Sequence, residues 1–179
     1  MGLFGKTWRA ARAAMRRDDG NATIEFVFLF PAIITVVLMA VEIGFLQTRS
    51  VLLDRAVDLA MREIRLGTLT PMNVTGLKQA ICNRSILIPD CLNSLTIELR
   101  PISTTTWGPL TGATQCVDRS QNITPVLQFT PGVKNELMLV RVCSVYEPFF
   151  PTSALAGKLQ HDASGSYALV SMSAFVNEP

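Results

Sequence analysis

The chain has 179 residues, of which 49% are hydrophobic and only 17% are charged, and its formal net charge is +2. A soluble domain averages about 25% charged residues, so the deficit indicates a membrane segment. The small net charge argues against nucleic acid as a partner. Residues 1–20 carry five basic side chains against two acidic ones, which is typical of a cytoplasmic leader or anchor.

An apolar run follows this basic head. Residues 26–48 contain one charged side chain, Glu42. As a helix they would rise about 35 Å, enough to cross a hydrocarbon core of about 30 Å. The run is longer than the apolar part of a secretory signal and lacks an A-x-A-like cleavage site, so we expect the protein to keep it. Pro31 should bend or loosen this helix. We interpret Glu42 as a carboxylate at the outer interface, with contact to a partner helix as the alternative.

The helix is expected to continue beyond the membrane. Residues 49–66 keep helical periodicity, and their apolar stripe is formed by Leu53, Val57, Ala60 and Ile64, widened by Leu52, Ala56 and Leu59. Gly67 suits the position after a helix end, and Pro71 prevents continuation. We therefore expect one helix over about 22–66, whose second half offers an apolar face to a small domain.

The rest of the chain predicts a small antiparallel sheet. Alternation and β-branched composition indicate strands, and a short amphipathic stretch indicates one more helix. The expected elements are a helix over 75–85, strands over 95–101, 137–149 and 166–179, a polar loop over 102–125, and a connection over 151–165. The predicted fold class is α+β, with a long N-terminal helix packed on a small, disulfide-bonded sheet domain.

Four cysteines all follow the apolar run: Cys82, Cys91, Cys116 and Cys143. No C-x-x-C pair occurs, which argues against a zinc site and against a thioredoxin-like redox motif. An even number of separated cysteines beyond a membrane span fits two disulfides in an oxidising compartment. Cys82 and Cys91 enclose a short loop, so we favour that bridge with Cys116–Cys143 among the three connectivities; one bridge and two free thiols is the alternative.

The orientation follows mainly from the cysteines. The positive-inside rule places residues 1–20 in the cytoplasm, although four arginines also follow the span closely. Disulfides require the C-terminal domain to lie outside the cytoplasm.

The segment before the apolar run carries the functional signal. Residues 16–26 read RRDDGNATIEF, so a basic leader ends in Gly20 and Glu25 follows five residues later at the edge of the apolar run. A carboxylate at the centre of a membrane helix costs about 2.5–3.5 kcal/mol on insertion scales. Glu25 lies near the boundary, where this cost is smaller, but a carboxylate there still marks a functional position. The alternative is a snorkelling side chain in an ordinary anchor.

These residues resemble the cleavage site of a type IV prepilin, and the whole chain resembles the TadE-like family of pseudopilins from Tad (Flp, type IVb) pilus systems. The segments that carry the resemblance are NATIEFVFLFPAII, with Glu25, Phe26 and Pro31, then VEIGFL (41–46), AICNRSILIPDCLNSLTIELRP (80–101), PGVKNELMLVRVCSVYEPFFP (131–151) and AFVNEP (174–179). Two departures are the acidic Asp18 and Asp19 before the cut and an ending at Pro179 where family members often continue with Phe. The sister TadF-like family shares the N-terminal pattern.

The resemblance implies that a prepilin peptidase cuts between Gly20 and Asn21 on the cytoplasmic face. Glu25 would then meet the new N-terminal ammonium of a neighbouring subunit. Phe26, the next residue of the motif, is implied in processing and assembly together with Glu25. The implied partners are the membrane, the peptidase, the Flp pilin, a TadF-like pseudopilin and inner-membrane platform proteins. The implied organisation is a leader (1–20), a transmembrane assembly helix (21–48) and a periplasmic domain (49–179) of a single-pass bacterial inner-membrane protein that could also enter the pilus.

Nothing in the sequence predicts catalysis, a metal or a cofactor. G-x-S-x-G, H-E-x-x-H and Gly-rich phosphate loops are absent, and His161 reads as a solvated loop residue. Asp118 and Ser120 begin a metal-adhesion-like pattern that Asn122 breaks, which argues against the von Willebrand-type domain of larger TadG-like relatives. The competing functions are an uncleaved, membrane-anchored binding domain and, with least support, an anchored periplasmic enzyme.

Overall fold

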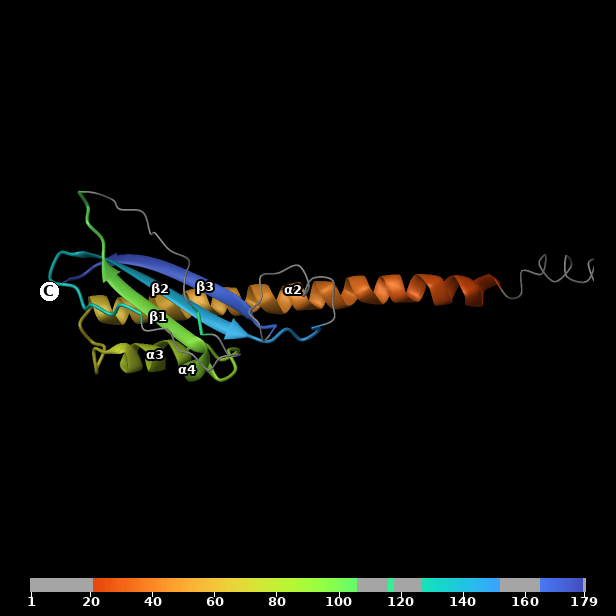
Figure 1. Cartoon of the computed structure of the whole chain (residues 1–179), viewed down its shortest axis with the longest axis horizontal. Coiled ribbons are helices and arrows are strands. Elements are labelled where there is room, and N and C mark those ends of the chain that lie inside the picture. Colours follow the sequence, from red (N-terminus) through yellow and green to blue (C-terminus); the bar gives the residue numbers. More distant parts are fainter. Residues whose placement is uncertain (1–20, 106–115, 118–126, 152–164, 179) are drawn as a thin grey trace, which may run out of the picture. The chain divides into compact units, whose positions relative to one another are not determined.

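The computed structural model describes residues 21–105, 116–117, 127–151 and 165–178. Its helices are α2 (Asn21–Arg65), α3 (Val74–Cys82) and α4 (Cys91–Ser94), and its strands are β1 (Leu95–Pro101), β2 (Leu137–Tyr146) and β3 (Tyr167–Val176), as drawn in Figure 1. The chain divides into two compact units between Val41 and Glu42. The predicted long helix, short helix and three strands are all present, so the α+β fold class is confirmed.

The first unit contains the apolar start of α2. The helix holds a segment long and apolar enough to cross a membrane by length and composition, and none of that segment is buried against the protein. Pro31 lies inside α2, which continues on both sides of it. An apolar helix surface of this size is stable only when lipid or other helices cover it.

In the second unit, the remainder of α2 packs through the predicted stripe. Leu53, Val57, Ala60 and Ile64 are all buried in the main core. The expectation that Leu59 widens this stripe was wrong, because Leu59 is exposed and Met61 is buried instead. At 3.6 residues per turn, position 61 lies beside positions 57 and 64, whereas position 59 falls on the opposite flank.

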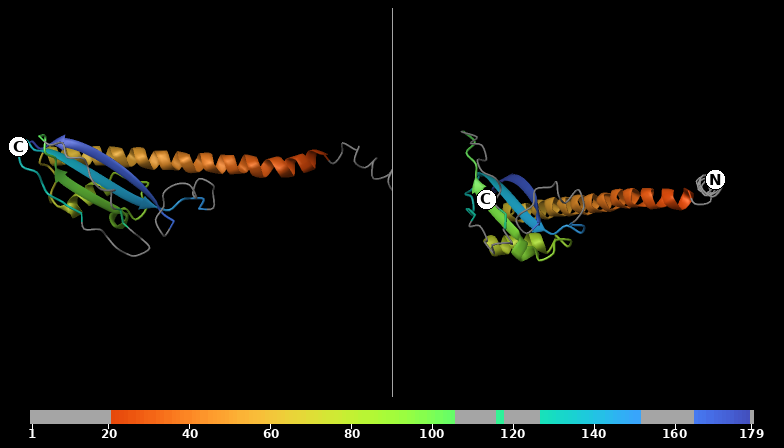
Figure 2. Two further views of the ribbon diagram at one scale, coloured as in Figure 1. Left: turned by 45° about the horizontal axis from the view of Figure 1, so that its top comes forward. Right: turned by 45° about the vertical axis from the view of Figure 1, so that its right-hand side comes forward.

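The three strands form one antiparallel sheet in the order β1-β2-β3. Side chains alternate across β2: Val140 and Val142 join the core with α2, α3 and β1, whereas Cys143 and Val145 form a second cluster on the other face. The views in Figure 2 show the strands lying along the C-terminal part of α2. Strand β2 ends at Tyr146, earlier than predicted, because Pro148 has no N–H with which to continue the ladder.

Helix α3 is held by a cap and by a close approach. The Asn73 side chain accepts a hydrogen bond from the Gly76 N–H at 2.8 Å, which satisfies a donor of the first turn. A Cβ at Gly76 would lie 2.2 Å from the Pro71 carbonyl oxygen, so only glycine fits there. The four-residue α4 was not predicted; it follows the loop that leaves α3 and leads directly into β1.

Candidate functional site

The predicted processing segment lies at the start of α2. Asn21, the residue after the expected cut, lies in α2, and Gly20 lies outside the described residues. Glu25 is exposed one turn into the helix and forms no ion pair with any residue that the structure describes. The ring of the exposed Phe26 stacks on that of Phe30, with centroids 5.1 Å apart. This turn therefore presents a carboxylate on an otherwise apolar helix surface.

The four cysteines form two disulfides, in the pairing favoured from the sequence. Cys82–Cys91 joins the last residue of α3 to the first residue of α4. Cys116–Cys143 fastens the segment at 116–117 to the middle of β2, on the face of the sheet opposite α2. Both bridges lie in the second unit and stabilise it by restricting its unfolded chain.

Glu42 is buried within the protein, which the sequence did not predict. Its side chain is only 1% exposed. One carboxylate oxygen, Oε1, accepts a hydrogen bond from the Phe149 N–H, and Oε2 accepts one from the Phe150 N–H, each at 3.1 Å. A buried carboxylate is stable only when its oxygens are satisfied, and here the segment after β2 provides both donors.

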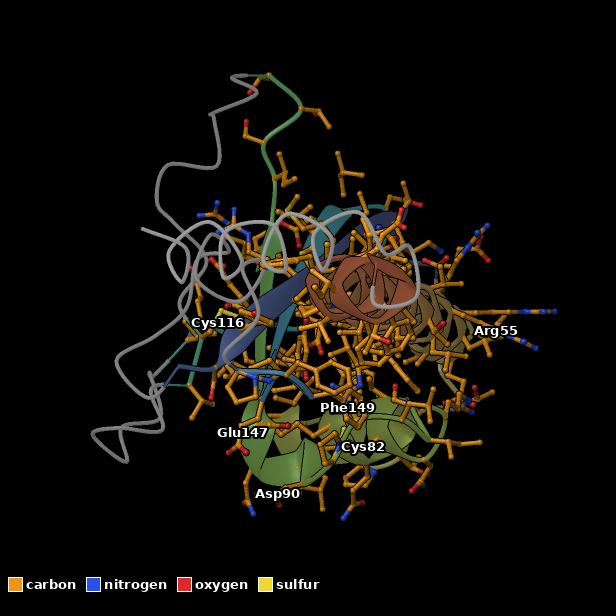
Figure 3. All side chains as sticks on the ribbon, turned by 90° about the vertical axis from the view of Figure 1, so that its right-hand side faces the viewer. Arg55, Cys82, Asp90, Cys116, Glu147 and Phe149 are labelled. Carbon is orange, nitrogen blue, oxygen red and sulfur yellow. A yellow bond between two sulfur atoms is a disulfide. The ribbon has the colours of Figure 1, made fainter. Side chains whose placement is uncertain are left out.

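Aromatic side chains and one arginine surround this carboxylate. The Arg49 guanidinium lies 4.8 Å from the centroid of the Tyr146 ring and 5.0 Å from that of Phe149, within cation–π range. Tyr146 packs edge-on against Tyr167 at 5.6 Å. We call Glu42, Arg49, Tyr146, Phe149 and Tyr167 the Glu42 cluster; Figure 3 shows Phe149 beside α2.

The Glu42 cluster is strongly desolvated. Burial raises the pKa of the Tyr146 phenol well above its usual range, Arg49 opposes this shift, and Glu42 adds to it. Burial, followed by the charge of Glu42, also raises the pKa of Tyr167. Neither phenol oxygen has a hydrogen-bond partner among the described residues. The cluster fixes α2 to the end of β2 through two hydrogen bonds and ring contacts.

Sequence reasoning missed this cluster because its parts lie far apart in the chain. The hydrogen bonds of Glu42 connect residues 107 and 108 positions apart. Two local signals existed: a lone acid inside an apolar helix, and the aromatic and proline-rich run at 146–151. Within the described part of the chain, no group of three or more His, Cys, Asp or Glu side chains could hold a metal ion.

Fold and site together define the class of this chain: an α+β protein with one N-terminal helix apolar enough to cross a membrane and a domain closed by two disulfides. The family model of TadE-like proteins matches residues 20–62, which confirms the resemblance to that family over α2. No curated protein matches the chain, and neither does any solved structure.

Proposed function

We propose that this chain is a pseudopilin of a Tad (Flp, type IVb) pilus system, cut by a prepilin peptidase between Gly20 and Asn21 and required to assemble or initiate the pilus. The observation that carries the proposal is the TadE-like match, which begins at Gly20 and runs along α2. Asn21 already lies in α2, so the cut would leave a mature chain that is helical from its first residues.

The chemistry of assembly would use Glu25. Cleavage creates an ammonium group at Asn21, where the apolar helix begins. A lone charge at such a low-dielectric boundary is costly, and pairing Glu25 of one subunit with the ammonium of its neighbour offsets both desolvation costs. Glu25 is exposed and has no ion-pair partner in the described chain, so it is free for this contact. The exposed apolar residues of 26–41 would then pack between subunits.

The proposed topology is a single span in the bacterial inner membrane. In this topology residues 1–20 would lie in the cytoplasm, where the peptidase acts. The two disulfides support a location of the domain in the oxidising periplasm. The partners are the prepilin peptidase, the Flp pilin, a TadF-like pseudopilin and the inner-membrane platform. An uncleaved membrane-anchored domain is the competing function, and the state of the Gly20–Asn21 bond separates the two.

Processing is tested with Gly20→Leu, expressed beside the cognate peptidase. A bulky residue before the scissile bond should block cleavage, so the variant should keep its full-length mass. Gly5→Leu is the matched control, because it changes a leader glycine away from the cut. Normal cleavage of Gly20→Leu would count decisively against the proposed site.

The assembly role is tested separately with Glu25→Ala. This variant should be processed but should not support pili when surface fibres are counted by electron microscopy. Asp54→Ala is the matched control, since it removes an exposed carboxylate of α2 outside the apolar run. Normal piliation with Glu25→Ala would remove the role assigned to this residue.

A further inference from the structure

The second unit carries an exposed apolar surface where α2 meets the segment after β2. Phe149 is 51% exposed, and its ring lies 4.7 Å from that of Phe45, which is also exposed. Ile43 is exposed on another side of the same helical turn. We call Phe45 and Phe149 the Phe149 surface. Prolines at 148 and 151 flank its loop and restrict the backbone that presents the ring.

Exposed charge is absent from the α2 side of this surface, whereas Glu147, two residues before Phe149, is exposed on the other side. Glu42, the only charged residue over 26–48, is buried with both oxygens hydrogen-bonded, so no charged side chain is exposed on that stretch of α2. Arg49 lies seven residues further along the helix, and its guanidinium covers the inner side of the Tyr146 and Phe149 rings. Along α2 the apolar ring of Phe45 is followed one turn later by Arg49, an order typical of a membrane interface.

The length of α2 places this surface at a defined depth. From Asn21 to Val41 the helix rises about 30 Å, which equals the thickness of the hydrocarbon core. With Asn21 at the cytoplasmic boundary, as the proposed cut on that face requires, the turn that contains Glu42 and Phe45 reaches the periplasmic boundary of the bilayer. Phe149 lies at the same level, because its N–H is bonded to Glu42 and its ring contacts Phe45.

We propose that the Phe149 surface inserts into the periplasmic boundary of the phospholipid bilayer, so that the folded domain rests on the membrane instead of being held away from it. Lipid is favoured as the occupant because the surface continues, along one helix, the apolar run proposed to span the bilayer. The inference rests on the membrane topology of the proposed function. The competing occupant, a helix of a neighbouring subunit, is an outcome of the test.

The test measures the depth of single tryptophans in the whole chain, reconstituted in vesicles of phosphatidylethanolamine and phosphatidylglycerol with brominated acyl chains. Trp8→Phe and Trp107→Phe remove the two native tryptophans. Phe149→Trp should show blue-shifted emission that is lost when the bromines lie near the headgroups. Phe30→Trp reports the span itself and should lose emission when the bromines lie near the chain ends. Met172→Trp is the matched control.

The control is exposed but distant from the proposed boundary. Met172 precedes Ser173, whose hydroxyl donates a hydrogen bond to Asp58 at 3.3 Å. Asp58 lies 16 residues beyond Glu42, about 24 Å further along α2, so a tryptophan at 172 should keep water-exposed emission that bromine does not reduce.

The outcomes separate the inference from its premise. If Phe30→Trp is quenched and Phe149→Trp is not, the span holds and the lipid contact is refuted. Blue-shifted but unquenched emission at position 149 indicates a protein neighbour and also refutes it. If neither position is quenched, the proposed membrane topology fails together with the inference.

Discussion

Replacing Glu42 tests whether the contact between α2 and the end of β2 stabilises the domain. The carboxylate accepts two backbone hydrogen bonds, from Phe149 and Phe150, in a site that is only 1% exposed. Glu42→Gln keeps one oxygen for one donor but turns an amide NH₂ toward the other. The variant therefore loses one hydrogen bond, keeps the other only as a bond between neutral groups, and brings two N–H donors face to face.

The expected magnitude follows from the number of bonds lost. A hydrogen bond to a charged group contributes about 1.5–3 kcal/mol, so Glu42→Gln should lower the free energy of unfolding by about 2 kcal/mol. Glu42→Ala loses both bonds and leaves a cavity, so it should cost about twice as much. A loss of 1.4 kcal/mol is about a tenfold change in the opening equilibrium.

Two measurements check this prediction on the whole chain in detergent micelles. Urea unfolding followed by near-ultraviolet circular dichroism gives the stability of the domain, and hydrogen exchange gives the opening of the Phe149 and Phe150 amides. Asp54→Asn is the control, because Asp54 is exposed on α2. An unchanged urea midpoint together with unchanged amide exchange in Glu42→Gln would refute the stabilising role of this carboxylate.

Three further predictions concern the same domain. Burial raises the pKa of Tyr146, so above about pH 10 the unfolded chain releases a proton that the native state keeps. The free energy of unfolding should therefore be constant below about pH 10 and fall above it. In urea titrations at stepped pH, Tyr146→Phe should make this fall smaller. Replacing Cys82 and Cys91 together by serine should lower the free energy of unfolding by about 2.6 kcal/mol. This loss is about 1 kcal/mol smaller than the loss on removing Cys116–Cys143, which closes a loop of 27 residues. A larger loss for Cys82–Cys91 in urea unfolding would contradict the loop-entropy argument. Gly76→Ala should lower the free energy of unfolding by about 1–3 kcal/mol, because the added Cβ overlaps the Pro71 carbonyl oxygen. Gly44→Ala, whose added Cβ meets no atom within 4 Å, should raise it by up to about 1 kcal/mol. Equal thermal midpoints for the two variants would show that the tight packing at Gly76 is unimportant.

Local patterns predicted the elements of this fold. The 3.6-residue spacing of Leu53, Val57, Ala60 and Ile64 located the buried face of α2, since a helix exposes that spacing directly in the sequence. Period-2 alternation located β1 and β3, and the apolar, β-branched composition of 137–149 located β2, each to within a few residues. The short loop between Cys82 and Cys91 made one bridge natural and left a single partner for each remaining cysteine.

Features that depend on distant pairing were not predictable in this way. The burial of Glu42 was not predicted, because its neighbours in the sequence are apolar and its hydrogen-bond donors lie in the segment after β2. The parallel bridge between Leu99 and Phe129 joins β1 to a residue outside the predicted strands. Leu59 is exposed because its position falls on the flank of α2 away from Val57 and Ile64, although the residue itself is apolar.

The central claim is that this chain is a processed, disulfide-bonded pseudopilin, and the intact mass of the unreduced protein tests it most directly. The protein should be purified from a strain that contains its own prepilin peptidase. We predict a mass that lacks residues 1–20 and is lower by four hydrogens, two for each disulfide. A full-length mass would contradict the pseudopilin assignment and leave an uncleaved, membrane-anchored domain.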